Sequence, residues 1–233
     1  MRILFITFLF FLMSSHIYSQ KNLAIVKDAD GVSNIRAKGN IDSEIVQEIS
    51  TGSLIYVDEG DSKWHRCFID DTLIGFIHSS RFCIFKSLDE GEKCQKIVEV
   101  FKRQIELDSL LNLSRLPNDS LVQLHDVYTT KMFHPITLEA TQYICAKNDL
   151  EVFMLFQKVM WENRGSAAEE PKYNFGELVY CLNEEMVLNL KENWSKDICL
   201  LWKGFFDQVL GESNDIGADE KLRLQILVNN LGA

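Results

Sequence analysis

Six cysteines and five histidines are the side chains whose types suit nucleophilic or metal chemistry. The cysteines are Cys67, Cys83, Cys94, Cys145, Cys181 and Cys199. A cysteine nucleophile needs a histidine base, yet the cysteines after Lys86 lie in apolar helical stripes and the later histidines, His125 and His134, lie in helical sequence. The sequence has no Cys-x-x-Cys, His-Glu-x-x-His, Gly-x-Ser-x-Gly or glycine-rich phosphate loop. We therefore predict no catalytic residue, no bound metal and no cofactor.

Paired carboxylates are the remaining route to catalysis, as in glycoside hydrolysis. Candidates for one member of such a pair are Glu139, Glu162, Glu177 and Glu184. Residues 87–233 carry 24 acidic side chains, so such pairs arise by chance and most acids belong to solvated faces. The acidic runs 28–31 and 58–61 are interpreted as polar turns and not as Ca²⁺ sites, because they lack the spacing of an EF-hand loop.

The cysteines leave the redox state of the chain open. An even number of cysteines in an exported protein permits disulfides, and six thiols allow 15 complete pairings. The apolar neighbours of Cys145, Cys181 and Cys199 suit buried thiols equally well. Both interpretations remain open from the sequence.

The first nineteen residues predict export. Arg2 precedes an apolar run from Ile3 to Met13, and small residues lead to a cleavage point between Ser19 and Gln20. The run spans roughly half of a ~30 Å hydrocarbon core, so a secretory signal peptide is favoured over a transmembrane helix. We expect a periplasmic or secreted protein with no transmembrane segment once the signal is removed.

The charge of the chain argues against two classes of partner. The net charge is −10 and the sequence pI is about 5.0, which disfavours nucleic acid and anionic membrane. Residues 20–86 carry 8 basic and 10 acidic side chains, whereas residues 87–233 carry 15 and 24. The acidity therefore lies mainly in the second part.

Short apolar runs separated by turn residues occupy the chain from Leu23 to Phe85. Their spacing of about ten residues and their β-branched and aromatic content are typical of short strands. Closing so small a sheet removes its exposed edges, so we predict a small β-barrel over residues 20–86.

The same segment resembles a bacterial SH3 domain. Four motifs carry the resemblance, in the family's order: Asn34-Ile-Arg36, Gly52 before Leu54-Ile-Tyr-Val57, Trp64-His-Arg-Cys67, and Gly75-Phe-Ile-His-Ser-Ser-Arg-Phe82. Phe76 stands where the family usually has Trp, and Arg36-Ala-Lys-Gly39 lacks the family's proline. The resemblance covers about a quarter of the chain. It implies an SH3-like β-barrel that binds ligands, often in proteins that act on cell-wall peptidoglycan.

A ligand groove in such a module would use amphipathic rings. The candidate ligand-binding residues are Tyr56, Trp64, His65, Phe76 and His78. Successive side chains of a strand point to opposite faces, so Trp64 and His65 are not expected in one groove. Structural roles compete with this interpretation: Gly52 and Gly75 for turns, Trp64 and Ile77 for the core, and Arg36 as the partner of an acid.

The apolar period changes to three or four residues after Lys86, which predicts an all-α domain over residues 87–233. The expected helices cover residues 89–113, 117–133, 135–147, 149–163, 173–182, 183–210 and 219–231. Proline and cap residues such as Pro135 and Asn148-Asp149 mark several starts. The fold class is therefore a multidomain β + α protein.

These features favour an exported, non-enzymatic binding protein of the bacterial envelope. Its partner would be a cell-wall fragment, a peptide or another envelope protein. An inhibitor or immunity-type antagonist of a cell-wall hydrolase, docking through the acidic helical domain, is the alternative. An enzyme that acts on peptidoglycan is the least favoured hypothesis.

Overall fold

The computed structural model divides the chain into two compact units, residues 1–90 and 91–233. It describes residues 21–60, 62–113, 119–162, 196–212 and 218–232, together with 174, 177, 178, 181–183, 187, 188 and 192. The predicted signal peptide, residues 1–19, lies outside the described residues. The division falls just after the domain boundary predicted at Lys86.

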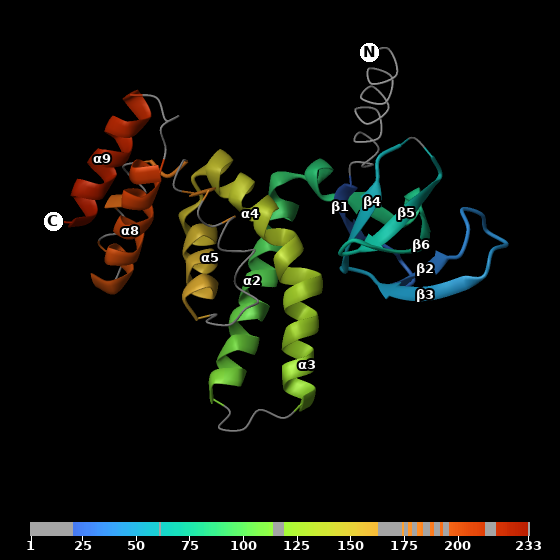
Figure 1. Ribbon diagram of the computed structural model, residues 1–233. Helices are drawn as coiled ribbons and strands as arrows, with labels where there is room; N and C mark the ends of the chain where they lie inside the picture. The colour runs from blue at the N-terminus through green and yellow to red at the C-terminus, as the bar shows by residue number, and fades with distance from the viewer. Residues whose placement is uncertain are drawn as a thin grey trace, which may run out of the picture. The chain divides into compact units, whose positions relative to one another are not determined.

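The first unit is a sheet of seven antiparallel strands (Figure 1). The strands are β1 (Lys21–Val26), β2 (Val32–Arg36), β3 (Ile45–Ser50), β4 (Leu54–Asp58), β5 (Trp64–Ile69), β6 (Thr72–His78) and β7 (Phe82–Ile84). Short 3-10 turns, η1 (Ser79–Arg81) and η2 (Phe85–Ser87), flank β7. The order across the sheet is β3-β2-β6-β5-β4-β1-β7.

This order shows that the predicted closed barrel is wrong. The sheet is open, because β3 and β7 end it and do not pair with each other among the described residues. β7 has only three residues between two 3-10 turns, so it is too short to continue the ladder. The edges are protected in other ways: β7 is short, and β3 carries the exposed Glu48. Protection of the sheet edges therefore does not depend on closure of a barrel.

The core of the sheet unit consists of small and β-branched side chains. Its buried members are Ala24, Val26, Ile35, Ile49, Ile55, Val57, Cys67 and Ile77. Gly75 has a φ of 142° within β6, and a Cβ there would lie 2.6 Å from the Arg36 carbonyl oxygen. Gly75 thus permits a close approach of β6 to β2, whereas the sequence assigned it to a turn.

The helical C-terminal part agrees with the prediction. α2 (Glu90–Leu113) and α3 (Asp119–Tyr128) are followed without a break by a π-helical turn, η3 (Thr129–Phe133), and by α4 (His134–Lys147). Pro135 is the second residue of α4, directly after this π turn. The expected break before Pro135 is instead this π turn, a local widening of a continuous helical path.

The remaining described helices are α5 (Leu150–Glu162), α8 (Lys196–Glu212) and α9 (Ala218–Gly232). Asn148 ends α4 in the left-handed conformation, and the Asp149 carboxylate accepts the Val152 amide at 3.1 Å. The ring of Phe101 in α2 packs against those of Phe133 and Phe156, with centroid distances of 5.7 and 5.0 Å. These aromatic contacts join α2, η3 and α5. The predicted helix 173–182 and the start of helix 183–210 fall largely outside the described residues.

No described helix is long and apolar enough to cross a bilayer.

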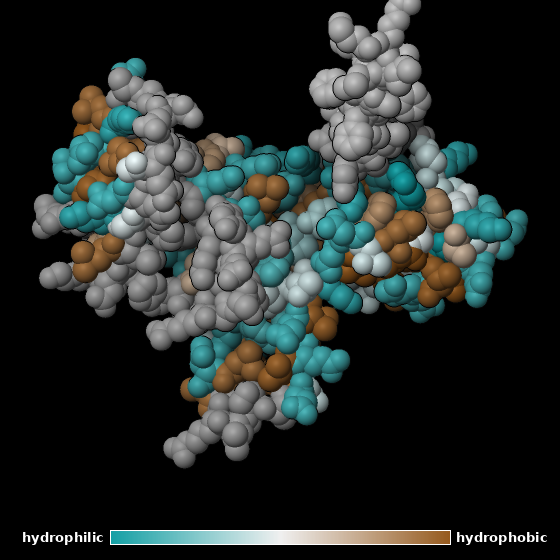
Figure 2. Space-filling model, in the orientation of Figure 1, coloured by the Kyte–Doolittle hydropathy of each residue, from teal (hydrophilic) through white to brown (hydrophobic). Residues whose placement is uncertain are grey.

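Hydrophobic residues reach the surface in both units, where Figure 2 shows them interspersed with hydrophilic ones. On the sheet unit the large exposed ones are Val32, Ile41, Ile45, Val46 and Leu73. Three of these belong to β3 or the loop that precedes it, which borders the groove described next.

Candidate functional site

A groove of about 520 Å³ lies on the sheet unit. Its lining residues come from the turn before β2, from β2, from the loop between β2 and β3, and from β5, β6 and η1. They are Asp28, Asp30, Val32, Asn34, Arg36, Gly39, Asn40, Ile41, Trp64, His78, Ser80 and Arg81. A concave site with an aromatic wall and several polar groups is the usual form of a ligand-binding pocket.

The floor of the groove follows from the period of β2. Val32, Asn34 and Arg36 alternate with Ser33 and Ile35, which are buried on the other face. Among the described residues, β2 pairs with β6 only at Arg36 and Phe76. Beyond that pair Asn34 and His78 both line the groove. The groove therefore opens where β2 and β6 stop pairing.

One end of the groove is held by the carboxylate of Asp28. It accepts the Asp30 amide at 3.1 Å, the Ser33 hydroxyl at 2.9 Å and the Arg81 guanidinium at 2.5 Å. The bond from the Asp30 amide lowers the pKa of Asp28, and Ser33 and Arg81 add to this against the opposing effect of burial. Asp28 thus fixes the acidic run 28–31 as a turn.

The other end is formed by the loop between β2 and β3. Arg36 donates to the Ser43 carbonyl at 2.5 Å, and the Lys38 amide donates to the Ser43 hydroxyl at 2.9 Å. Among the described residues no carboxylate pairs with Arg36, so the acid partner expected for it is not present there. A Cβ at Gly39 would lie 3.0 Å from the Trp64 Cβ, so the lack of a side chain lets this loop approach Trp64.

Trp64 and His78 face each other across β5 and β6, with ring centroids 5.2 Å apart and an edge-on arrangement. The Nδ1 atom of His78 accepts the Ser80 amide at 3.3 Å, so the proton of the neutral imidazole is on Nε2. The Ser80 hydroxyl lies 2.8 Å from the same Nδ1. Among the described residues no carboxylate pairs with His78 to orient it as a base, so this contact is that of a cap on η1.

The chain matches no protein-family model, no curated protein and no solved structure. The resemblance of the first unit to bacterial SH3 domains therefore stays a prediction.

The structure places the predicted ligand residues in four settings. Trp64 and His78 line the groove. Phe76 does not line it, although its ring is 3.5 Å from the position of a Cβ on Gly39, which does. Tyr56 is half-buried on β4 opposite Phe68 and does not line the groove. His65 is buried, where it contacts the Phe82 ring at 5.2 Å and the Asp58 carbonyl at 3.1 Å.

Sequence reasoning missed the polar residues of the groove. The sequence places Asn34 and Arg36 in a motif and offers Arg36 as the partner of an acid, although their alternation with Ser33 and Ile35 already assigns both to one face of β2. Asp30, Asn40 and Arg81 carried no signal of this kind, because turns and loops that are distant in the sequence bring them together. The half-buried Trp64 belongs to the groove wall and not to the core set.

A buried polar cluster in the helical unit is the second arrangement of chemically capable residues. The Asp108 carboxylate oxygen Oδ1 accepts from His125 Nε2 at 2.7 Å and from Gln104 Nε2 at 3.1 Å. The Thr129 hydroxyl donates to the Gln104 side-chain oxygen at 3.2 Å. The Asp108 Oδ2 atom is buried without a partner among the described residues. This cluster links α2 to α3 at the first residue of the π turn.

The stability of this cluster depends on pH. The hydrogen bond to Asp108 raises the pKa of His125, with Asp126 adding to the effect and burial opposing it. The imidazolium therefore stabilises the folded unit fully below the ordinary histidine pKa of about 6.5, and this contribution is lost as the pH rises through the raised pKa. We expect a His125→Asn variant to lack the loss of stability that the parent protein shows as the pH rises above about 6.5.

Urea unfolding of the full chain between pH 6 and pH 9 measures this difference. A His134→Asn variant is the matched control, because His134 lies on the same helical path outside the cluster, and it should keep the parent's pH dependence. Parallel curves for His125→Asn and the parent would contradict the role given to His125.

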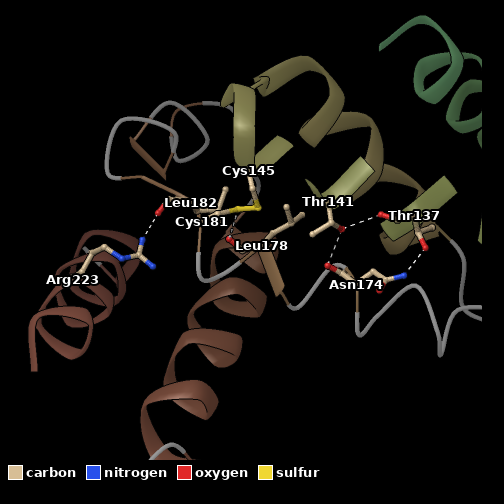
Figure 3. Close-up of a disulfide and its surroundings, with 8 residues drawn as sticks. All are labelled: Thr137, Thr141, Cys145, Asn174, Leu178, Cys181, Leu182 and Arg223. Atoms are coloured by element: carbon tan, nitrogen blue, oxygen red, sulfur yellow. Dashed lines mark hydrogen bonds between the residues drawn. A yellow bond between two sulfur atoms is a disulfide. The ribbon is translucent and has the colours of Figure 1, made fainter. Parts of the chain in front are cut away.

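One disulfide joins Cys145 of α4 to Cys181, with the two Cα atoms 5.2 Å apart (Figure 3). Asn174 makes two further contacts with α4. Its main-chain carbonyl accepts the Thr141 hydroxyl at 3.0 Å, and its side-chain amide donates to the Thr137 hydroxyl at 2.6 Å. Arg223 of α9 donates to the Leu182 carbonyl. We call Asn174, Leu178, Cys181 and Leu182 the docked segment. Asn174 and Cys181 contact α4, Leu182 contacts α9, and the Leu178 carbonyl accepts the amides of Cys181 and Leu182.

The other described cysteines carry free thiols: Cys67 and Cys199 are buried, and Cys83 and Cys94 are half-buried. Burial raises the pKa of Cys67 to about 12, so its thiolate is not populated near neutral pH. The two interpretations left open by the sequence thus apply to different cysteines.

Proposed function

We propose that this protein is an exported, non-enzymatic binding protein of the bacterial envelope, and that its sheet unit holds a cell-wall fragment or peptide in the groove. The observation that carries the proposal is the groove itself, where Trp64 and His78 stand beside the polar side chains of Asn34, Arg36 and Asn40. Export and the envelope setting rest on the predicted signal peptide and on the resemblance to bacterial SH3 domains.

Binding without catalysis is supported by how the reactive groups of the groove are used. His78 caps η1 through Nδ1, and Arg81 is held by Asp28. Both groups therefore serve to shape the groove. The aromatic ring of Trp64, by contrast, stabilises a complex with any ligand whose face it shields from water.

A pelleting experiment with purified peptidoglycan tests the proposal. The full chain should be retained with the insoluble wall, and Trp64→Ala should lower retention about tenfold, since losing an aromatic anchor typically costs 1–2 kcal/mol or more of binding free energy. Tyr56→Ala is the matched control, because it removes a half-buried aromatic ring from the same sheet away from the groove. It should bind like the parent.

A second variant tests the groove independently, in case Trp64→Ala fails to fold. Ile41 lines the groove but is 67% exposed, so Ile41→Ser should weaken retention without destabilising the sheet. Equal retention of the parent, Trp64→Ala and Ile41→Ser would refute the groove as the binding site. Retention that requires an added wall hydrolase would instead support the antagonist hypothesis.

A further inference from the structure

We propose that the ligand of the groove is a short extended peptide with a positive group at one end and a negative group at the other. This inference rests on the proposed function, because it names the ligand class of the same groove. It follows from the distribution of charge along β2, from the length of the floor and from the separation of β2 and β6.

The two ends of the groove carry opposite charges. Before the start of β2, Asp28 and Asp30 face Arg81, whose guanidinium lies 2.5 Å from Asp28 and 3.8 Å from Asp30. Asp28 uses its carboxylate within the fold, whereas the Asp30 side chain is 81% exposed. Asp30 is therefore the accessible acidic group that lines this end of the groove.

The opposite end carries the guanidinium of Arg36. One of its nitrogens donates to the Ser43 carbonyl, which leaves further N–H donors without a carboxylate partner among the described residues. A guanidinium donates to a carboxylate through two parallel hydrogen bonds, which makes it a selective partner for that group. A ligand carboxylate beside Arg36 would complete this end of the groove.

The length of the groove floor matches a peptide of about four residues. β2 runs from Val32 to Arg36, which at about 3.3 Å per residue corresponds to roughly 13 Å. An extended chain covers about 3.3–3.6 Å per residue, so four residues span the same length. The positive end of the peptide would lie beside Asp30 and the negative end beside Arg36, parallel to β2.

The unpaired stretch of β2 suits an extended backbone. Since β2 pairs with β6 only at Arg36 and Phe76, its residues 32–35 are not in a ladder with β6 among the described residues. A strand lying there can use main-chain hydrogen bonds as in other strand-addition complexes. The half-buried Trp64 and the exposed Ile41 provide apolar surface for the side chains. A neutral sugar would stack on the ring of Trp64 but has no charged groups to pair with Asp30 and Arg36.

Synthetic tetra-alanine is the first probe, compared with its N-acetylated and C-amidated forms. Binding to the ¹⁵N-labelled full chain is followed by NMR titration to about 10 mM peptide. We expect shifts at Trp64 and Asn34, about tenfold weaker binding after C-amidation and about threefold to fivefold weaker binding after N-acetylation. Acetylation of the amine should have the smaller effect, because Asp30 is exposed and water screens its charge. Absence of shifts at 10 mM, or equal binding of all three forms, overturns the proposal.

Variants of the protein assign each end. Asp30→Asn should weaken tetra-alanine about threefold to fivefold and should abolish the effect of N-acetylation, but not that of C-amidation. Asp42→Asn removes the same charge from the neighbouring loop without lining the groove, and should leave both effects intact. Arg36→Gln should abolish the effect of C-amidation, whereas Arg36→Lys keeps the charge and should keep part of it. Unchanged effects in Asp30→Asn and Arg36→Gln count against the assignment.

The test separates failure of this inference from failure of the proposed function. If the wall pellets the protein through Trp64 but tetra-alanine does not bind, the groove binds a wall component and the peptide class is wrong. Shifts with di-N-acetylchitobiose and none with tetra-alanine would identify a sugar ligand and overturn the inference. Loss of both wall and peptide binding would refute the proposed function as well.

Discussion

Replacing Gly75 with alanine should lower the free energy of unfolding of the sheet unit by about 2–5 kcal/mol. A Cβ at this position would lie 2.6 Å from the Arg36 carbonyl oxygen and 2.7 Å from Ile35 Cγ2, distances that require β2 or β6 to move. The φ of 142° adds backbone strain for any residue with a side chain. Since Arg36 and Phe76 are the point where the two strands pair, the groove should also lose its floor.

Gly60→Ala separates the two causes. Gly60 has a φ of 153°, close to that of Gly75, but nothing lies within 4 Å of its Cβ position. It should therefore show the strain alone, about 1 kcal/mol or slightly more. Urea titration followed through NMR signals of the sheet unit measures both variants. An equal loss in the two variants would show that the close approach of β2 to β6 contributes nothing.

The sheet unit shows which features of a fold can be predicted from short-range sequence patterns and which cannot. The runs around Leu54–Val57 and Trp64–Ile69 predicted strands, because alternation and β-branched residues are local properties. Closure is decided by the last strand, and Phe82–Ile84 is cut short by 3-10 turns on both sides. Nothing in the sequence before Phe82 contains that information. The error in fold class therefore concerns one contact between the two ends of the sheet.

The helical unit was easier to predict because its signals are local. Asn148 and Asp149 mark the end of α4 and the start of α5 through a left-handed residue and a side-chain cap. Pro135 misled, since proline in a first turn is compatible with continuing a helical path when a π turn precedes it. A buried cluster such as Asp108 with His125 joins two helices, and helical periodicity gives no sign of it.

The groove was only partly predictable for the same reason. Aromatic type singled out Trp64 and His78, and these do lie in the groove. The same criterion also chose His65, although strand alternation assigns it to the face opposite Trp64. The charges that give the groove its two ends come from a turn, a strand and η1, so their proximity is a product of the sheet order.

Removing the disulfide should destabilise the helical unit by about 3–4 kcal/mol, the largest effect expected there. Cys145 and Cys181 are 36 positions apart, so the bond closes a long loop and restricts the unfolded chain. The polar contacts of the docked segment, from Thr141 and Asn174 among others, each contribute only about 0.5–1.5 kcal/mol net. They should not hold the segment on α4 once the bond is broken. Thermal unfolding of Cys145→Ala/Cys181→Ala, compared with the parent protein, measures the loss.

Three comparisons make this prediction specific to the bond. Cys145→Ala alone should lose nearly as much stability as the double variant, because either substitution removes the whole cross-link. Cys94→Ala is the matched control for a half-buried thiol outside the bond, and it should stay within about 1 kcal/mol of the parent. Hydrogen exchange locates the effect: the Leu182 amide, which donates to the Leu178 carbonyl at 2.9 Å, should exchange much faster in the double variant. If exchange at Leu182 and the melting temperature both stay at the parent's values, the docked segment is held by its polar contacts and the disulfide is dispensable.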